Sequence, residues 1–191
     1  MPTRDDILNA TEEVLRRYGP EKTNVVDVAR KLDVSHGTIY RHFSSKSELR
    51  DAVTRRWLRR VERPLAAISA EEDAAEERLR RWLETLLTIK QERRRSDPEM
   101  FATYYRLAQE ATGIVDEHVS TLVDQVTAIV DDGRREGDFC VSDSRRAARA
   151  VFHATSRFHH PARSETWDDP ESQEQFEAVW HLLLTGLKGE G

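Results

Sequence analysis

The sequence has little of what builds covalent cross-links or membrane anchors. Its single cysteine, Cys140, excludes an intrachain disulfide and is consistent with a reducing cytosol. No run approaches the roughly 18 uninterrupted apolar residues of a membrane-spanning helix. Charges at positions 4 to 6 interrupt the N-terminal segment, where a secretory signal would need an apolar core. We therefore expect a cytoplasmic protein with no membrane partner.

Recognisable enzyme signatures are also missing from the sequence. It has no glycine-rich phosphate loop and no nucleophile elbow, and its histidines fit no metal-ligand spacing. We therefore predict a protein that is not an enzyme and has no resident metal or cofactor. Redox sensing by Cys140 and metal binding near His159 and His160 stay open as alternative roles for those residues.

Charged residues are abundant, at 34% of the 191 residues, and they are unevenly distributed. Residues 1–64 contain 14 Lys and Arg against 10 Asp and Glu, a net charge of +4, so the remainder carries −9 of the total of −5. A basic N-terminal part attracts phosphate, while an acidic remainder keeps the protein in solution. The imbalance is weak support for a nucleic-acid partner.

Apolar residues recur at helical spacing along almost the whole chain, and the alternation typical of strands is absent. The pattern predicts an all-α fold of about nine helices. We expect the first helix to end at Gly19-Pro20 and the fourth to kink or end at Pro64. The eighth is expected over residues 142–158, and the last from Asp169-Pro170.

Residues 24–49, NVVDVARKLDVSHGTIYRHFSSKSEL, carry the most specific pattern. Two short helices, capped by Asn24 and Ser35, are joined by a tight turn at Asp33, and Ser45 with Glu48 forms a capping box for the next helix. In the second short helix only Ile39 and Phe43 point inward, so it buries little. This arrangement is typical of a helix-turn-helix, whose second helix enters the DNA major groove.

This segment resembles the reading head of the tetracycline-repressor (TetR) family, whose pattern is roughly T-V-x-D-I-A-x-x-A-G-V-S-x-G-T-L-Y-x-H-F-x-S-K-x-x-L. The resemblance covers residues 4–60, with two departures in the turn: Leu32 replaces an alanine, and Asp33 replaces a glycine but tolerates a left-handed backbone. The residues at the family positions, identical or closely similar, are Asn24, Val25, Asp27, Val28, Ala29, Val34, Ser35, Gly37, Thr38, Ile39, Tyr40, His42, Phe43, Ser45, Lys46 and Leu49.

The resemblance implies which residues contact DNA. It places Thr23 and Asn24 at a phosphate, Tyr40 and Lys46 on the DNA backbone, and His36 among the base-reading residues, where it sets the sequence preference. The full predicted set is Thr23, Asn24, His36, Gly37, Thr38, Tyr40, Arg41, His42 and Lys46.

The resemblance also implies two domains. Residues 1–48 would form the DNA-binding domain, and a helix over 46–66 would link it to a ligand-binding and dimerisation domain at 67–191. The candidate ligand residues, which plain core packing would explain as well, are Trp82, Phe101, Tyr104, Tyr105, His118, Phe152 and His153. The candidate dimer residues, on the eighth and ninth expected helices, are Ala147, Ala148, Val151, Phe176, Val179, Trp180, Leu183, Leu184 and Leu187.

These patterns predict a DNA-binding transcriptional regulator. We expect a repressor that responds to an unknown small-molecule effector and binds a double-stranded, pseudo-palindromic operator as a homodimer. Activation of transcription, and a helical interaction module without DNA function, are the alternatives.

Overall fold

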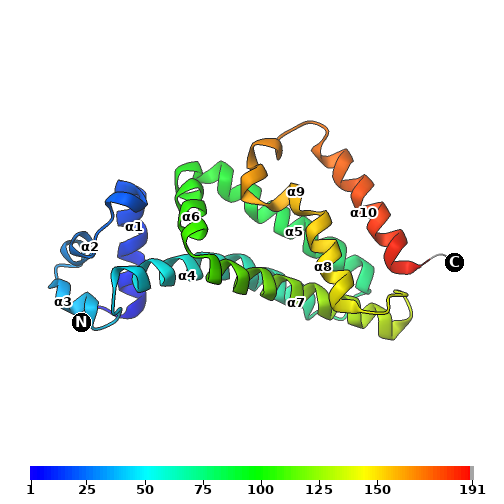
Figure 1. Ribbon diagram of the computed structural model, residues 1–191, viewed down its shortest axis with the longest axis horizontal. Helices are drawn as coiled ribbons and strands as arrows, with labels where there is room; N and C mark the ends of the chain where they lie inside the picture. Colours follow the sequence, from blue (N-terminus) through cyan, green and yellow to red (C-terminus); the bar gives the residue numbers. More distant parts are fainter. Residues whose placement is uncertain (190–191) are drawn as a thin grey trace. The chain divides into compact units, whose positions relative to one another are not determined.

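The structure is a computed structural model that describes residues 1–189, and all of its regular elements in that range are helical (Figure 1). The all-α prediction is confirmed, with ten α-helices and one 3-10 helix where about nine helices were expected. The elements are α1 (Arg4–Lys22), α2 (Val25–Lys31), α3 (His36–Tyr40), α4 (Lys46–Ser69), α5 (Ala75–Ser96), α6 (Pro98–Glu110), α7 (Thr112–Glu136), α8 (Ser144–Ala154), α9 (Ser156–His159), η1 (Pro161–Thr166) and α10 (Ser172–Lys188).

The additional helices arise between residues 142 and 172. Instead of one helix over 142–158, α8 ends at Ala154 and α9 begins at Ser156, with Thr155 between them at a φ of −87° and a ψ of −1°. Pro161 then opens η1, and α10 begins at Ser172 rather than at Pro170. Sequence periodicity alone did not reveal these interruptions.

Two prolines have different effects from one another. Gly19 adopts a φ of +74° and interrupts α1 as predicted, while Pro20 starts one further turn that runs to Lys22. Pro64 does not end α4, which continues to Ser69. Burial of Leu65 and Ile68 in the apolar core stabilises the turn beyond Pro64 despite the missing N–H donor.

The chain forms two compact units. The N-terminal unit comprises residues 1–60 and 97–117, and it contains α1 to α3, the first part of α4, and α6. One apolar cluster joins Ile7 and Val14 of α1 to Met100 and Leu107 of α6. Packing therefore groups α6 with the helix-turn-helix, whereas the sequence analysis placed it in the ligand-binding and dimerisation domain at 67–191. The functional boundaries at residues 48 and 67 stay a prediction.

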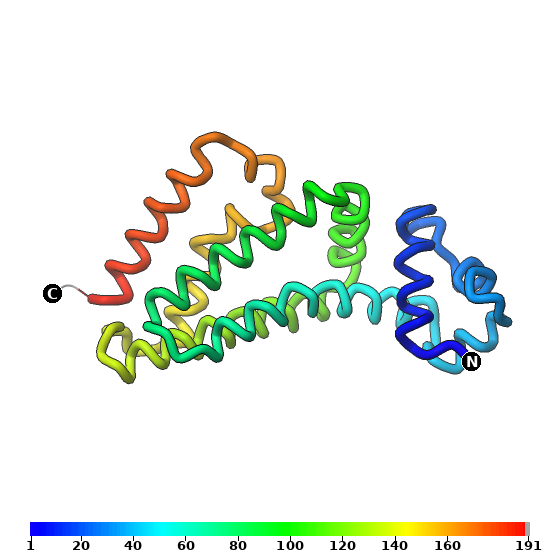
Figure 2. The backbone as a smooth tube through the Cα atoms, turned by 180° about the vertical axis from the view of Figure 1, so that it is seen from behind, coloured from blue at the N-terminus to red at the C-terminus, as the bar shows by residue number. Residues whose placement is uncertain are grey.

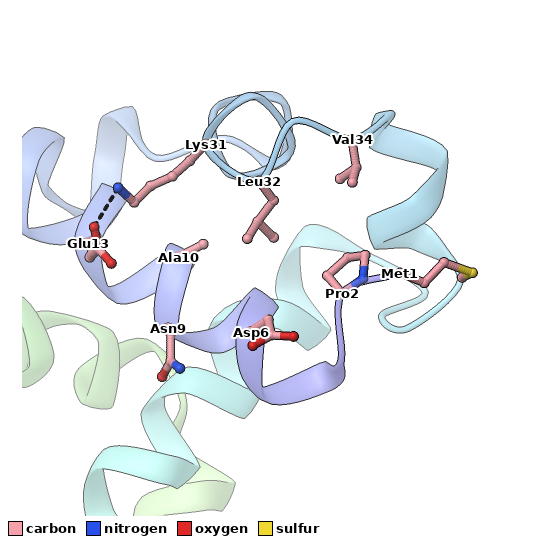
Figure 3. Close-up of a pocket in the computed structure, with 9 residues that line it drawn as sticks. All are labelled: Met1, Pro2, Asp6, Asn9, Ala10, Glu13, Lys31, Leu32 and Val34. Atoms are coloured by element: carbon pink, nitrogen blue, oxygen red, sulfur yellow. Dashed lines mark ion pairs between the residues drawn. The ribbon is translucent and has the colours of Figure 1, made fainter.

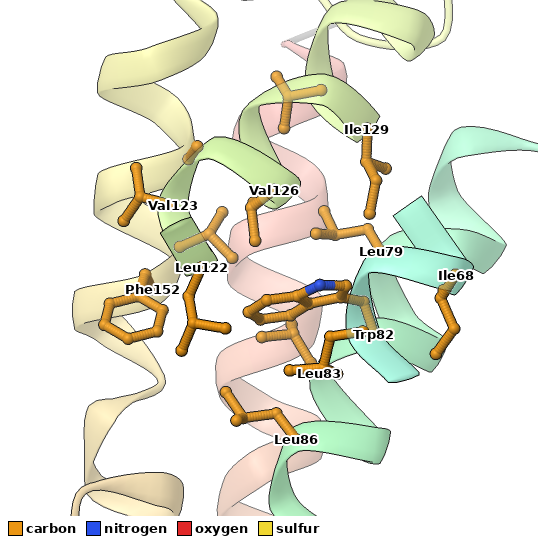
Figure 4. Close-up of a cluster of buried hydrophobic side chains, with 14 of the residues drawn as sticks. Ile68, Leu79, Trp82, Leu83, Leu86, Leu122, Val123, Val126, Ile129 and Phe152 are labelled. Atoms are coloured by element: carbon orange, nitrogen blue, oxygen red, sulfur yellow. The ribbon is translucent and has the colours of Figure 1, made fainter. Parts of the chain in front are cut away.

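The C-terminal unit comprises residues 61–96 and 118–189 of the described chain (Figures 1 and 2). Its core surrounds the Trp82 ring with Leu79, Leu83, Leu86 and Leu122 (Figure 4). A Cβ atom added to Gly133 would lie 2.5 Å from the Phe139 ring, so only glycine allows this close approach. No helix within residues 1–189 is long and apolar enough to cross a membrane.

Arg78 of α5 ties together the ends of three segments in the C-terminal unit. Its side chain is 2% exposed and donates to the carbonyl oxygens of Ser69 at 3.2 Å and Glu71 at 2.7 Å, and to Asp132 of α7 at 2.8 Å. A guanidinium group has enough donors to satisfy all three acceptors at once. Arg78 therefore fixes the connection from α4 to α5 against α7.

Candidate nucleic-acid interface

Helix α3 is anchored by the buried Ile39 within it and by Phe43 just after it. Ile39 and Phe43 are buried in the cluster that also contains Val28 of α2. His36 and Tyr40 are exposed one turn apart, and their rings meet edge to face with centroids 6.3 Å apart. The structure thus gives α3 an exposed polar face, as the sequence pattern predicted.

The turn before α3 also has the predicted geometry. Asp33 adopts a φ of +52°, and the Val34 N–H donates to the Ala29 carbonyl at 3.0 Å. Aspartate tolerates this left-handed conformation better than most residues, so it replaces the usual glycine without loss of the turn. Ser35 precedes α3, but its hydroxyl contacts Thr38 Oγ1 at 3.1 Å rather than capping a backbone N–H.

Two predicted DNA contacts have buried side chains. Thr38 is 7% exposed, and its hydroxyl oxygen accepts a bond of 3.2 Å from Arg41. The Thr23 hydroxyl donates to the Gly19 carbonyl at 2.7 Å. The Thr23 hydroxyl thus bonds to the local backbone, and the Thr38 hydroxyl bonds to neighbouring side chains, while Gly37 and Arg41 are exposed and His42 is half-buried.

Asn24 and Lys46 bring the beginnings of two helices together. The Lys46 ammonium donates to Asn24 Oδ1 at 3.2 Å, which joins the start of α4 to the start of α2. The Asn24 side chain does not cap α2, contrary to the expectation from sequence, because its amide group bonds to the Lys22 carbonyl and to Lys46 instead. Lys46 lies at the positive end of its own helix, which favours an external anion there.

Arg4 is a positioning residue that the sequence analysis missed. Its guanidinium group donates to the His42 carbonyl at 2.9 Å and lies 4.1 Å from the centroid of the Phe43 ring. It also pairs with Glu48 at 3.6 Å. Arg4 thereby connects the beginning of α1 to the corner between α3 and α4, and no local pattern in the sequence indicates this contact.

The predicted capping box at the start of α4 is displaced by one residue. Ser45 Oγ accepts from the Glu48 N–H at 3.0 Å, as expected, but the Glu48 carboxylate accepts from the backbone and hydroxyl of Ser44 instead of Ser45. The hydrogen bonds from Ser44 hold the pKa of Glu48 below its usual value. The corner is thus stabilised while Glu48 is ionised.

A pocket of about 610 Å³ lies between α1 and the turn after α2 (Figure 3). Leu32 and Val34 contribute apolar side chains to it, and an ion pair of 2.5 Å joins Lys31 to Glu13 at its edge. None of the predicted DNA-contacting residues lines this pocket. It is therefore separate from the exposed face of α3.

The candidate ligand residues are divided between the two units. Phe101, Tyr104 and Tyr105 belong to the N-terminal unit, and the other four belong to the C-terminal unit. Tyr104 is 2% exposed and stacks on Trp57, with ring centroids 4.7 Å apart and an interplanar angle of 10°. Burial, followed by the nearby Glu12 carboxylate, raises the pKa of its hydroxyl. These contacts make Tyr104 part of the core of the N-terminal unit.

The four remaining ligand candidates differ in their surroundings. Trp82 and Phe152 belong to the core of the C-terminal unit (Figure 4), whereas His153 is exposed. His118 is buried, and its Nδ1 lies 2.7 Å from the Glu62 carboxylate. Two of the seven candidates, Tyr104 and His118, combine burial with a polar atom that has no hydrogen-bond partner among the described residues: the Tyr104 hydroxyl and His118 Nε2.

The candidate dimer residues are largely used within the chain. The structure buries Ala148, Val151, Phe176, Trp180 and Leu187 in the core of the C-terminal unit, where α8 packs against α10. Ala147, Val179, Leu183 and Leu184 are half-buried. Leu182, which the sequence analysis did not select, is 73% exposed and is the most accessible leucine of α10.

Comparison with known proteins identifies two matching family models. Residues 7–53 match the model described as bacterial regulatory proteins, tetR family, and residues 75–180 match the tetracyclin repressor-like C-terminal domain. A curated HTH-type transcriptional repressor of Mycobacterium tuberculosis is 38% identical over 47 residues. That alignment spans only 25% of the relative and 25% of this chain.

Solved structures resemble the chain over nearly its full length. A TetR transcription regulator from Haloarcula marismortui has a TM-score of 0.74 at 19% identity, with 97% of this chain and 98% of that chain covered. SmeT, the repressor of the Stenotrophomonas maltophilia multidrug efflux pump SmeDEF, has a TM-score of 0.72 at 18% identity, with coverage of 100% and 93%. At these identities the likeness concerns the fold.

Proposed function

The chain belongs to the tetR family of bacterial regulatory proteins, whose members are DNA-binding transcriptional regulators, and we propose that it represses transcription from a pseudo-palindromic operator. The exposed polar face of α3 carries this proposal, because His36, Gly37 and Tyr40 are outward on a helix that is otherwise fixed by Ile39 and Phe43. The names of similar repressors favour repression over activation. Such a regulator would act in the cytoplasm and needs no catalytic step.

In the proposed complex, the exposed face of α3 enters the major groove. His36 at the first position of the helix would contact a base edge, and Gly37 would let the helix backbone approach closely. Tyr40, Arg41 and Lys46 would contact phosphates, which position the protein without selecting a sequence.

A second copy of the chain is the proposed partner. Ala178, Leu182 and Gly186 are exposed on α10 at intervals of four residues, so they share one face of that helix. Ala150 and Ala154 are exposed at the same interval on α8. We assign these apolar stripes to a homodimer interface, which would place two copies of α3 roughly 34–36 Å apart in successive major grooves.

The proposed effector is a small molecule bound by the C-terminal unit. It can release DNA only if it binds one conformation of the protein more tightly than the other. By linkage, DNA then lowers the affinity for the effector by the same factor, typically about 5–150-fold.

DNA binding can be tested with labelled fragments from the region next to the gene. We expect specific retention that weakens steeply with salt, since phosphate contacts release counterions. Lys46→Ala should reduce the salt slope by about one and weaken all sequences alike, whereas His36→Ala should change sequence preference by about 1–3 kcal/mol.

Lys31→Ala is the matched control, because it removes the same charge away from the predicted DNA contacts. Lys31 is exposed, pairs with Glu13 and lines the pocket of Figure 3. It should leave the salt slope unchanged. Retention of no fragment above the non-specific level at moderate salt would exclude the proposed function.

A further inference from the structure

A pocket of about 440 Å³ lies in the C-terminal unit, where α9 and η1 lead from α8 toward α10 (Figure 1). Its volume is within the range of about 300–1,000 Å³ that is typical of small-molecule sites. Basic and hydroxyl side chains dominate the lining, and no carboxylate contributes to it. The residues that line this α9–η1 pocket are Ser156, Arg157, His160, Ala162, Arg163 and Thr166.

The two arginines of the α9–η1 pocket have no counter-ion within the protein. Both are exposed, and among residues 1–189 no carboxylate pairs with Arg157 or Arg163. Asp168, just after η1, is bonded to two arginines of α5 instead, and Glu165 is exposed and does not line the pocket. Two like charges that share one pocket repel each other, so an anion bound between them would be attracted by both.

The main chain, rather than the guanidinium groups, holds this segment in place. Trp167, which is 3% exposed, donates from its Nε1 to the Arg157 carbonyl at 3.2 Å. The Arg163 N–H donates to the His160 carbonyl at 2.8 Å. Both arginines are therefore anchored through their backbones, while their guanidinium groups form no hydrogen bond or ion pair with another described residue.

Neutral donors lie beside the two charges. His160 Nδ1 accepts a hydrogen bond of 3.2 Å from the Ala162 N–H, so the neutral ring carries its hydrogen on Nε2, which can donate. The Ser156 side chain is half-buried, and its hydroxyl makes no hydrogen bond within residues 1–189. The Thr166 hydroxyl already donates to the Arg163 carbonyl at 3.0 Å. The pocket thus offers donors from Ser156 and His160 next to two positive charges.

This set of groups matches a phosphate monoester. Such a group carries a charge of about −1.5 to −2 at pH 7 and three strong acceptor oxygens. Each guanidinium group presents a planar fork of donors that fits two of those oxygens. A carboxylate, with a single charge and two oxygens, would leave one of the two arginines without a partner.

We propose that the α9–η1 pocket binds the phosphate group of a small phosphorylated organic molecule. Arg157 and Arg163 supply the opposing charges, and Ser156 and His160 Nε2 supply neutral hydrogen bonds. The rest of the pocket holds the organic part of the molecule. The inference rests on the proposed effector response and names the chemical class of the effector.

The position of the pocket suggests how a ligand would act on the protein. Residues 155–171 connect α8 to α10, the two helices whose exposed stripes we assign to the homodimer interface. A phosphate held by Arg157 of α9 and Arg163 of η1 would fix this connection in one conformation. DNA is then released if the dimer that fits the operator needs another conformation.

The test uses calorimetry on the full chain at about pH 8, where phenyl phosphate is doubly charged. We expect phenyl phosphate to bind, and phenyl sulfate, which has the same ring but a single charge, to bind about fivefold more weakly. Inorganic phosphate should also bind more weakly than phenyl phosphate, because it leaves the rest of the pocket unfilled.

Substitutions locate the binding. Arg157→Met and Arg163→Met should each weaken phenyl phosphate at least about tenfold, and Arg163→Lys, which keeps the charge but loses the fork, should fall between Arg163→Met and the wild type. Arg134→Met is the matched control, because it removes an exposed arginine of α7 that does not line the pocket, and it should bind like the wild type. None of these side chains is bonded within the described chain, so all variants should keep the wild-type Tm.

Several outcomes would overturn the assignment. These are no phenyl phosphate binding at about 1 mM, the weakest affinity of interest, or unchanged binding in both methionine variants of the pocket. An equal loss in Arg134→Met would show attraction to surface charge alone, and equal affinity for inorganic phosphate would exclude an organic ligand. Operator binding, measured separately, without phenyl phosphate binding would refute this inference alone, whereas phosphate binding at Arg163 without DNA binding would refute the proposed function.

Discussion

Gly37 offers the sharpest separation of DNA binding from stability. It lies in α3, and a Cβ atom added there would meet only Ser35 Oγ, at an ordinary contact distance of 3.7 Å. Its φ is not in the left-handed region, so nothing within the protein requires glycine at this position. If Gly37 is present because DNA approaches the α3 backbone, Gly37→Ala should damage binding without damaging the fold.

The expected magnitudes have opposite signs. Alanine in a helix is about 0.5–1 kcal/mol more favourable than glycine, so the free energy of unfolding should rise, which corresponds to an increase in Tm of roughly 1–4 °C. Operator affinity should fall at least about tenfold, or 1.4 kcal/mol, because the new methyl group displaces the helix from the base edges. Thermal unfolding and fluorescence anisotropy on the same samples measure the two effects.

Gly113 provides a matched control in the same unit. It lies in α7 and its added Cβ would meet nothing within 4 Å, so Gly113→Ala should give a similar gain in stability with unchanged DNA affinity. Wild-type operator affinity in Gly37→Ala would refute the close-approach argument. A loss of stability in that variant would show instead that α3 needs glycine for its own packing.

The other predictions concern assembly and stability. Leu182→Glu should convert the dimer to monomers in sedimentation experiments while helicity is kept. The control Ser142→Glu adds the same charge at an exposed position outside α10 and should remain dimeric. A Leu182→Glu variant that is still a dimer would refute the proposed interface. Arg78→Met should lower the free energy of unfolding by about 1–3 kcal/mol, because it removes three hydrogen bonds of a buried side chain, to the Ser69 and Glu71 carbonyls and to Asp132. Arg81→Met on the same helix, whose partners are exposed, should cost within about 1 kcal/mol, and equal losses in denaturant titrations would contradict the assigned role of Arg78. Tyr104→Ala should destabilise the protein by about 3–5 kcal/mol, as expected for a stacked core ring, and wild-type stability would show that this ring is not part of the core.

The helix-turn-helix could be predicted from the sequence because its determinants are close together along the chain. The spacing of Val25, Val28 and Ile39 defines the inward faces, and Asp33 marks the turn where the structure shows a φ of +52°. These signals act over a few residues, so a linear pattern contains them. The same reasoning could not reveal that the Thr38 and Thr23 hydroxyls are engaged within the protein.

The candidate ligand and dimer residues show where periodicity is insufficient. An apolar stripe indicates that a helix face is buried, but it does not say whether the covering surface belongs to the same chain. Trp180 and Phe176 were assigned to a partner and are buried within the chain, while the exposed Leu182 was not selected. Tyr104 was assigned to a ligand and stacks on Trp57 instead.

By itself, the sequence determined the all-α class, the position of the helix-turn-helix and the outward residues of α3, since periodicity and turn chemistry are local properties of the chain. Only the tertiary structure decided that α6 packs with α1, that Arg4 bonds to the His42 carbonyl, and that Glu62 meets His118. The last two pairs are separated by 38 and 56 residues. Such contacts depend on how whole helices pack, and no short-range pattern records which distant side chains that packing brings together.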